Sequence, residues 1–199
     1  VRIPLKSVLR IILSLPGEDN TGRYIVSQIR IPKACTAVIA GCGLSVSGLQ
    51  MQTLFRNPLA EPSVLGVTAG ASLGVAAIML GGGSIITLYT IRELGISGSW
   101  LITLTGCMGA AGVMLLVIAI SRKVRDNVVM LIIGVMVSTA TLSIISIWQY
   151  FSDAELIKDY LLWTFGSLGG VTGAQLYILA AVTLTGLILS FLSSKMLDA

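Results

Sequence analysis

Five long stretches of this 199-residue sequence contain no charged residue. Each exceeds the roughly 20 residues that a helix needs to cross the hydrocarbon core of a bilayer. Charged residues make up only 11% of the chain, against about 25% in a typical soluble domain. We therefore predict an all-α, polytopic membrane helical bundle. The charge-free stretches are residues 34–55, 62–91, 94–121, 127–152 and 160–194.

Glycines and aromatic residues at the ends of these stretches shorten the predicted spans. Together the spans form one transmembrane domain over residues 34–199. The five predicted spans cover about residues 34–55, 63–82, 99–121, 127–150 and 171–194.

A polar lead-in, residues 1–33, precedes the first span. Apolar residues at helical spacing after Pro4 predict a short amphipathic helix at the membrane interface. The segment "PGEDNTG" at 16–22 is typical of a turn. A second interfacial helix is predicted to lead to "RIPK", where Pro32 suits the first turn of the following span.

Several functional classes are disfavoured by what the spans lack. The chain has no histidine, which removes the commonest general base and the commonest metal ligand. It has no Walker A motif for binding ATP. No Asp, Glu, Lys or Arg lies at mid-depth of a predicted span, although ion-coupled carriers generally need such groups near the midplane. These absences argue against a catalytic centre, a cofactor or metal site, ATP binding and ion coupling in this chain.

The net charge of +4 is explained by cations at span ends, so no nucleic-acid partner is expected. The short connection 122–126 is basic and 153–159 is net acidic, which places the first in the cytoplasm and the second outside. Aromatic residues around 151–160 resemble an interfacial belt on the outer side. The same assignment puts the basic lead-in, residues 1–33, outside, against the rule unless another span precedes it.

Small and polar residues recur at helical spacing in two spans. Gly66, Gly70 and Gly74 form a bare strip against which another helix can pack closely. In the fourth span, Thr139, Ser143, Ser146 and Tyr150 form a polar stripe. Hydroxyl groups can satisfy themselves on the preceding turn's carbonyls, so ordinary helix packing and a water-filled path both remain open.

The segment "RNPLAEP", residues 56–62, interrupts two apolar stretches. Pro58 and Pro62 stop a helix, and Asn57 can bind freed backbone groups. We predict a short, stiff turn with Arg56 at the cytoplasmic surface.

Two blocks of sequence resemble one known family. "RIPK" at 30–33, followed by "GCGLSVSGLQMQTLFRNPLAEPSVLGVTAGASLG" ending at Gly74, is similar to the signature of FecCD-type permeases. These are ABC importer permeases for iron–siderophore, haem and cobalamin cargo. "WTFGSLGG" at 163–170 is similar to a second landmark of that family. The resemblance runs over essentially the whole chain.

The resemblance implies a permease of about ten helices in the inner membrane. It would work as a homodimer or with a sister permease, two cytoplasmic ATPases and an extracytoplasmic binding protein. The five spans then form a partial chain, with one family helix before Val1 and the remaining helices after Ala199. A preceding helix resolves the topology conflict, because it places the lead-in outside.

The resemblance also implies residue roles. Arg30 and Lys33 match basic positions that dock the binding protein, with lysine where the family usually has arginine. The hydroxyl stripe would face the translocation path. An ion-coupled secondary transporter is the alternative, and a membrane enzyme is a third. The segment that matches the cytoplasmic gate is Asp126, Asn127 and Val128, with valine at a commonly polar position.

Overall fold

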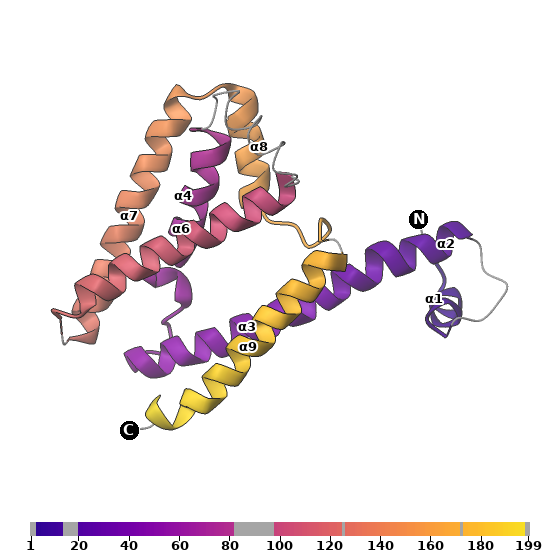
Figure 1. Cartoon of the computed structure of the whole chain (residues 1–199), viewed down its shortest axis with the longest axis horizontal. Coiled ribbons are helices and arrows are strands. Elements are labelled where there is room, and N and C mark those ends of the chain that lie inside the picture. The colour runs from indigo at the N-terminus through magenta and orange to yellow at the C-terminus, as the bar shows by residue number, and fades with distance from the viewer. Residues whose placement is uncertain (1–2, 14–19, 82–97, 125, 172, 198–199) are drawn as a thin grey trace. The chain divides into compact units, whose positions relative to one another are not determined.

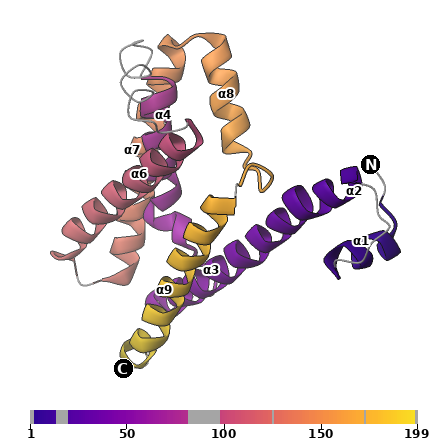
Figure 2. The ribbon, with the colours of Figure 1, turned by 45° about the vertical axis from the view of Figure 1, so that its right-hand side comes forward.

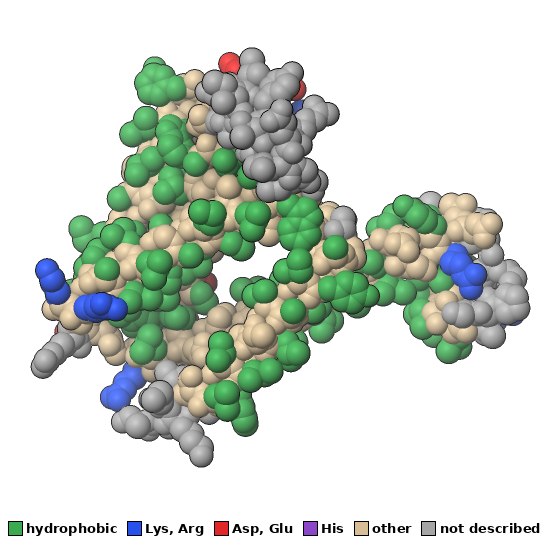
Figure 3. Space-filling view, in the orientation of Figure 1, with side chains coloured by type: hydrophobic (Ala, Val, Ile, Leu, Met, Phe, Trp, Pro, Cys, Tyr) green, Lys and Arg blue, Asp and Glu red, His purple; other side chains and the backbone are tan. Residues whose placement is uncertain are grey.

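The computed structural model describes residues 3–13, 20–81, 98–124, 126–171 and 173–197, and all regular elements within these ranges are helical (Figure 1). The all-α prediction is therefore confirmed. Hydrophobic side chains cover much of the long helices on the face drawn in Figure 3. Among the described residues, four helices are long and apolar enough to cross a membrane, and Val67–Met79 is a shorter apolar helix. The four are Asn20–Phe55, Gly98–Ser121, Asn127–Phe151 and Gly173–Ser193.

The chain divides into two compact units, one of Val1–Ser47 with Ser167–Ala199 and one of Gly48–Gly166. The first unit contains α1 (Leu5–Ile12), α2 (Asn20–Tyr24), the π-helix η1 (Ile25–Arg30), most of α3 (Ile31–Phe55) and α9 (Gly173–Leu197). The second contains the end of α3, the 3₁₀ turn η2 (Pro62–Leu65), α4 (Val67–Met79), α6 (Gly98–Ser121), α7 (Asn127–Phe151) and α8 (Ala154–Thr164).

The sequence predicted a separate interfacial helix before the first span, but the structure joins the two. α2, η1 and α3 form one continuous helix of 36 residues, Asn20–Phe55. The π-helix lies directly before Pro32, and the Ile31 N–H bonds to the Val26 carbonyl, five residues back. A proline ring clashes with the carbonyl four residues earlier in an α-helix, and a π turn displaces that carbonyl. The predicted turn at 16–22 lies outside the described residues up to residue 19, and its last three residues begin α2.

In the second unit, α4 lies among α6, α7 and α8 (Figures 1 and 2). Its 13 residues extend about 20 Å at 1.5 Å per residue, less than the roughly 30 Å hydrocarbon core. The predicted second span, 63–82, was longer because it counted the 3₁₀ turn as helix. Gly66 separates the two elements with a φ of 81°, a conformation open to glycine without a steric penalty. The predicted end at residue 82 lies outside the described residues.

The connection predicted at 153–159 is instead part of a helix, α8 (Ala154–Thr164). Its apolar side chains Leu156, Ile157 and Trp163 pack against a buried cluster that includes Tyr160 of the same helix. Their spacing of one, three and three positions is that of one helical face. The acidic residues that suggested a loop lie mostly on the exposed side. A helix that packs on α4 therefore replaces most of the expected loop.

Candidate functional site

Close backbone contact joins α4 to its neighbours through glycine. A Cβ atom at Gly74 would lie 2.0 Å from the Thr105 carbonyl oxygen of α6, and one at Gly70 would lie 2.5 Å from that of Gly109. Gly109 reciprocates, since its Cβ would lie 2.2 Å from the Gly70 oxygen. Real Cβ atoms essentially never approach so closely. The backbones of α4 and α6 are thus in direct contact, which small residues permit where membrane helices pack.

A further glycine contact, at Gly134 of α7, was not singled out from the sequence. Its Cβ would lie 2.5 Å from the Val64 carbonyl oxygen of η2. Four residues later on α7, the Ser138 hydroxyl lies 3.0 Å from where a Cβ at Gly66 would stand. The four-residue spacing of Gly134 and Ser138 is a small-residue signal that the sequence does contain.

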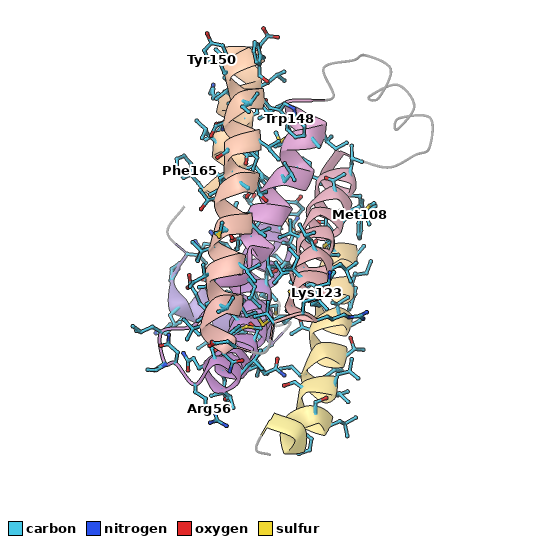
Figure 4. The ribbon with its side chains drawn as sticks, turned by 90° about the vertical axis from the view of Figure 1, so that its left-hand side faces the viewer. Arg56, Met108, Lys123, Trp148, Tyr150 and Phe165 are labelled. Atoms are coloured by element: carbon cyan, nitrogen blue, oxygen red, sulfur yellow. The ribbon has the colours of Figure 1, made fainter. Side chains whose placement is uncertain are left out.

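The "RNPLAEP" turn is held by a set of local hydrogen bonds. Arg56 has a φ of 48°, which reverses the chain after α3. The Asn57 N–H donates to the Gln52 carbonyl at 3.1 Å, and its Oδ1 accepts from the Leu59 N–H at 2.9 Å. Pro62 opens η2, whose missing N–H costs nothing at a first helical position. Arg56 lies at one end of this unit, and Tyr150 lies at the other (Figure 4).

The three candidate gate residues lie where α7 begins. The Asp126 carboxylate caps the helix, accepting from the Val128 N–H at 2.7 Å and more weakly from the Val129 N–H at 3.4 Å. The Asn127 side chain donates from Nδ2 to the Leu54 carbonyl oxygen of α3 at 3.0 Å, across 73 residues of sequence. Val128 is 63% exposed. The start of α7 is therefore tied to the end of α3, beside the Arg56 turn.

Replacing Asn127 with alanine should loosen this connection. We expect a loss of about 1 kcal/mol in the free energy of unfolding, because one exposed hydrogen bond is removed and water can solvate the Leu54 carbonyl. Thermal unfolding of the purified permease in detergent measures the loss. Val128→Ala is the matched control, since its side chain is exposed and should change little. Equal stability of the two variants would show that the Asn127 bond contributes nothing.

The predicted hydroxyl stripe of α7, namely Thr139, Ser143, Ser146 and Tyr150, is exposed along its whole length. The first three hydroxyls donate to carbonyls one turn back, at 2.9, 2.9 and 3.0 Å. At 3.6 residues per turn the stripe lies on the side of α7 opposite the buried residues, which are Gly134, Thr141 and Ile145. The self-satisfied hydroxyls are available on a surface that no described residue covers.

The opposite end of this unit is built around α8. The Tyr160 ring stacks on Trp163 with centroids 6.2 Å apart. Tyr160 belongs to a buried cluster with Val75 and Ile145, and Trp163 packs against that cluster. Burial raises the pKa of the Tyr160 phenol, and a hydrogen bond with Ser72 of α4 partly offsets the rise. The phenol is therefore protonated at physiological pH. Gly166, with a φ of 72°, ends the helix as a left-handed cap.

The candidate docking cations lie in the first unit. Arg30 is the last residue of η1, and Lys33 follows in the first turn of α3. Both side chains are exposed. Three residues apart on one helix, they face the same side. The described residues contain no cluster of three or more histidine, cysteine or acidic side chains that could hold a metal.

Apolar helices that cross a bilayer, close packing through glycine and an exposed hydroxyl stripe define a multi-pass membrane protein with a polar helix face. The chain belongs to the FecCD transport family, whose model matches residues 1–199. The recognition made from "RNPLAEP" and its neighbouring blocks is therefore confirmed, as is the location in the inner membrane.

Two relatives of the chain are permease proteins of transport systems. Over 170 residues the chain is 31% identical to the vitamin B12 import system permease BtuC of Escherichia coli O17:K52:H18. The matched region is 84% of this chain and 48% of BtuC. Over 176 residues it is 30% identical to the hemin transport system permease HmuU of Yersinia pestis, covering 88% of this chain and 50% of HmuU. The chain thus spans about half the length of these two permeases.

A solved structure has the same fold. An inward-facing metal-chelate type ABC transporter matches with a TM-score of 0.76 and 26% sequence identity, over 98% of this chain and 60% of that chain. The helical architecture is therefore that of an ABC transporter permease.

Proposed function

We propose that this chain is the membrane-spanning permease subunit of a binding-protein-dependent ABC importer, with no enzymatic activity of its own. The cargo class is an iron–siderophore, haem or cobalamin-type molecule, as the names of the relatives suggest. The observation that carries the proposal is the exposed hydroxyl stripe of α7. The other side of this helix is buried, with Gly134 in close contact with the backbone of η2. Such a stripe offers weak polar contacts along a fixed surface.

The translocation path is formed between this chain and a second permease copy. Self-bonded hydroxyls offer only their remaining lone pairs and leave no strong partner for the cargo. A bulky molecule can therefore move along them without being trapped. Charged groups that would couple transport to an ion are absent from the described part of the α7 helix, which disfavours the ion-coupled alternative.

Energy comes from partner ATPases on the cytoplasmic side. The gate lies at Asp126, Asn127 and Val128, next to the Arg56 turn. The supporting observation is the Asn127 bond to the Leu54 carbonyl, which links two helix ends with one replaceable contact. A switch between inward and outward exposure needs such a small difference in contacts between two states.

Uptake by the complete transporter in proteoliposomes tests this function. With the binding protein outside and ATP inside, we expect cargo to accumulate when all ion gradients are collapsed with ionophores. Omitting the ATPase subunits should abolish uptake. Uptake that persists without ATPase, and stops when a proton or sodium gradient is removed, would establish the secondary transporter instead.

Docking of the binding protein uses Arg30 and Lys33. Reversing both to glutamate should weaken the affinity of the permease for the binding protein at low salt by about tenfold, about 1.4 kcal/mol, because a steering attraction becomes a repulsion. Surface plasmon resonance on permease in nanodiscs measures the affinity. Lys123→Glu, an exposed cation on the other side of the membrane in this topology, is the control. An unchanged affinity in the double variant would remove the docking role.

A further inference from the structure

The first helix, α1 (Leu5–Ile12), presents an apolar side that no described residue covers. Three exposed apolar residues of α1 and the apolar residue at its C-cap recur at intervals of four, three and one positions and so lie on one helix face. They are Leu5, Leu9, Ile12 and the C-cap Leu13, with exposed fractions of 75%, 51%, 56% and 67%. We call these four residues the α1 apolar face. Eight residues in one helix rarely expose so much apolar surface to water without a partner.

The α1 apolar face is not the side that attaches α1 to the protein. Ile11, 6% exposed, is the buried residue of α1, and it lies away from Leu9 and Leu5 around the helix. α1 contacts η1, whose buried residue is Val26, 1% exposed. The side of α1 that carries Ile11 thus packs on the protein, and the α1 apolar face remains exposed.

The contact with η1 determines the depth of α1. Val26 and Phe55 are 29 positions apart on one continuous helix, which corresponds to about 44 Å at 1.5 Å per residue. A bilayer with its headgroups is about 40–45 Å thick. Because a helix of this length is long enough to cross the bilayer, Val26 near its N-terminal end reaches the membrane surface on that side. α1 is therefore held at the level of the lipid headgroups.

Charge beside the apolar face complements those headgroups. Lys6 is exposed, and one residue step of 100° places it at the edge of the face, next to Leu5. Arg10 follows one turn later on the same flank. Long cationic side chains can keep their heads among lipid phosphates while their stems cover apolar surface. Apolar residues on one side and cations on the flank are the pattern of a helix lying in the membrane interface.

We propose that α1 is a membrane-surface helix, with the α1 apolar face inserted at the headgroup–acyl boundary of the leaflet nearer the N-terminal end of the helix Asn20–Phe55. Lys6 contacts lipid phosphates there. The helix anchors the extramembrane end of α2 and η1 against the bilayer. This role is independent of the transport function, since it concerns only the placement of the lead-in.

Spin labels on the full-length transporter in nanodiscs test the proposal. The three cysteines, Cys35, Cys42 and Cys107, are first replaced by serine, and a nitroxide is attached to Leu9→Cys or to Lys6→Cys in separate samples. We expect the ratio of collisions with oxygen to collisions with a water-soluble nickel complex to be severalfold higher at Leu9 than at Lys6, because oxygen concentrates in the acyl region.

Two results would overturn the proposal. Equal ratios dominated by nickel would place the α1 apolar face in water, and low collision rates with both reagents at Leu9 would show that protein covers it. In a second experiment, Lys6→Glu should lower the ratio at Leu9 while Lys6→Arg keeps it, because only the first replaces attraction to phosphate with repulsion. An unchanged ratio in Lys6→Glu would overturn the role of Lys6.

Discussion

Substituting alanine for Gly74 should prevent the permease from accumulating in folded form. The added Cβ would lie 2.0 Å from the Thr105 carbonyl oxygen and 3.2 Å from the Gly109 Cα. Backbone atoms cannot move aside as a flexible side chain can, so α4 and α6 must separate along their contact. Overpacking of this kind costs about 1–3 kcal/mol and occasionally more, and we expect the upper end of that range.

The matched control for this variant is Gly112→Ala on α6. No atom lies within 4 Å of a Cβ built at Gly112, and alanine also has the higher helix propensity. Size-exclusion chromatography and thermal unfolding in mild detergent compare the two. A Gly74→Ala protein with the yield and melting temperature of Gly112→Ala would contradict the backbone-distance packing of α4 on α6.

Tryptophan at Ser143 should block transport without unfolding the protein. Ser143 is exposed in the middle of the hydroxyl stripe, so a large ring there points away from the buried side of α7. On the translocation path, however, it would narrow the route for a bulky cargo. We expect ATP-driven uptake to fall by about tenfold or more, which corresponds to about 1.4 kcal/mol added to the barrier.

Ile144→Trp, one residue further along α7, is the control for position. Ile144 is also exposed, at 45%, but lies 100° away from Ser143 around the helix. Uptake and melting temperature are measured for both proteins. If the two tryptophans reduce uptake equally, or if Ser143→Trp lowers only the melting temperature, the stripe does not line the path.

The long helices were the most predictable part of the fold. A charge-free stretch of more than 20 residues has few alternatives to a membrane helix, because lipid leaves backbone groups no other partner. Asp126, the last charged residue before the fourth charge-free stretch, set the predicted start of that span, and in the structure its carboxylate caps α7. The structure begins that helix at Asn127, the residue expected from the sequence.

The less predictable parts depend on contacts between distant segments. The charged residues of 153–159 led to the prediction of a loop where the structure has α8. That helix is stabilised by packing of Tyr160 and Trp163 on α4 and α7. The π turn before Pro32 arises from a backbone clash and has no composition signal. The Asn127 bond to Leu54 spans 73 residues, so no local pattern could reveal it.

The sequence predicted which residues of the candidate site share a helix face, but not which helices those faces contact. Helical spacing alone grouped Gly70 with Gly74, and Thr139 with Ser143. It could not say that the glycines meet Gly109 and Thr105, or that the hydroxyl stripe lies opposite the buried side of α7. Those facts depend on which helix faces which, and that is set by the whole unit.

Membrane orientation is the claim on which the import account depends most directly. Single cysteines at Lys33 and Lys123, both exposed positions, are introduced after Cys35, Cys42 and Cys107 are replaced by serine. A membrane-impermeant thiol reagent on intact cells should label the cysteine at Lys33 and reach that at Lys123 only after permeabilisation. Labelling at Lys123 but not at Lys33 in intact cells would invert the topology and contradict uptake through a binding protein docked at Arg30.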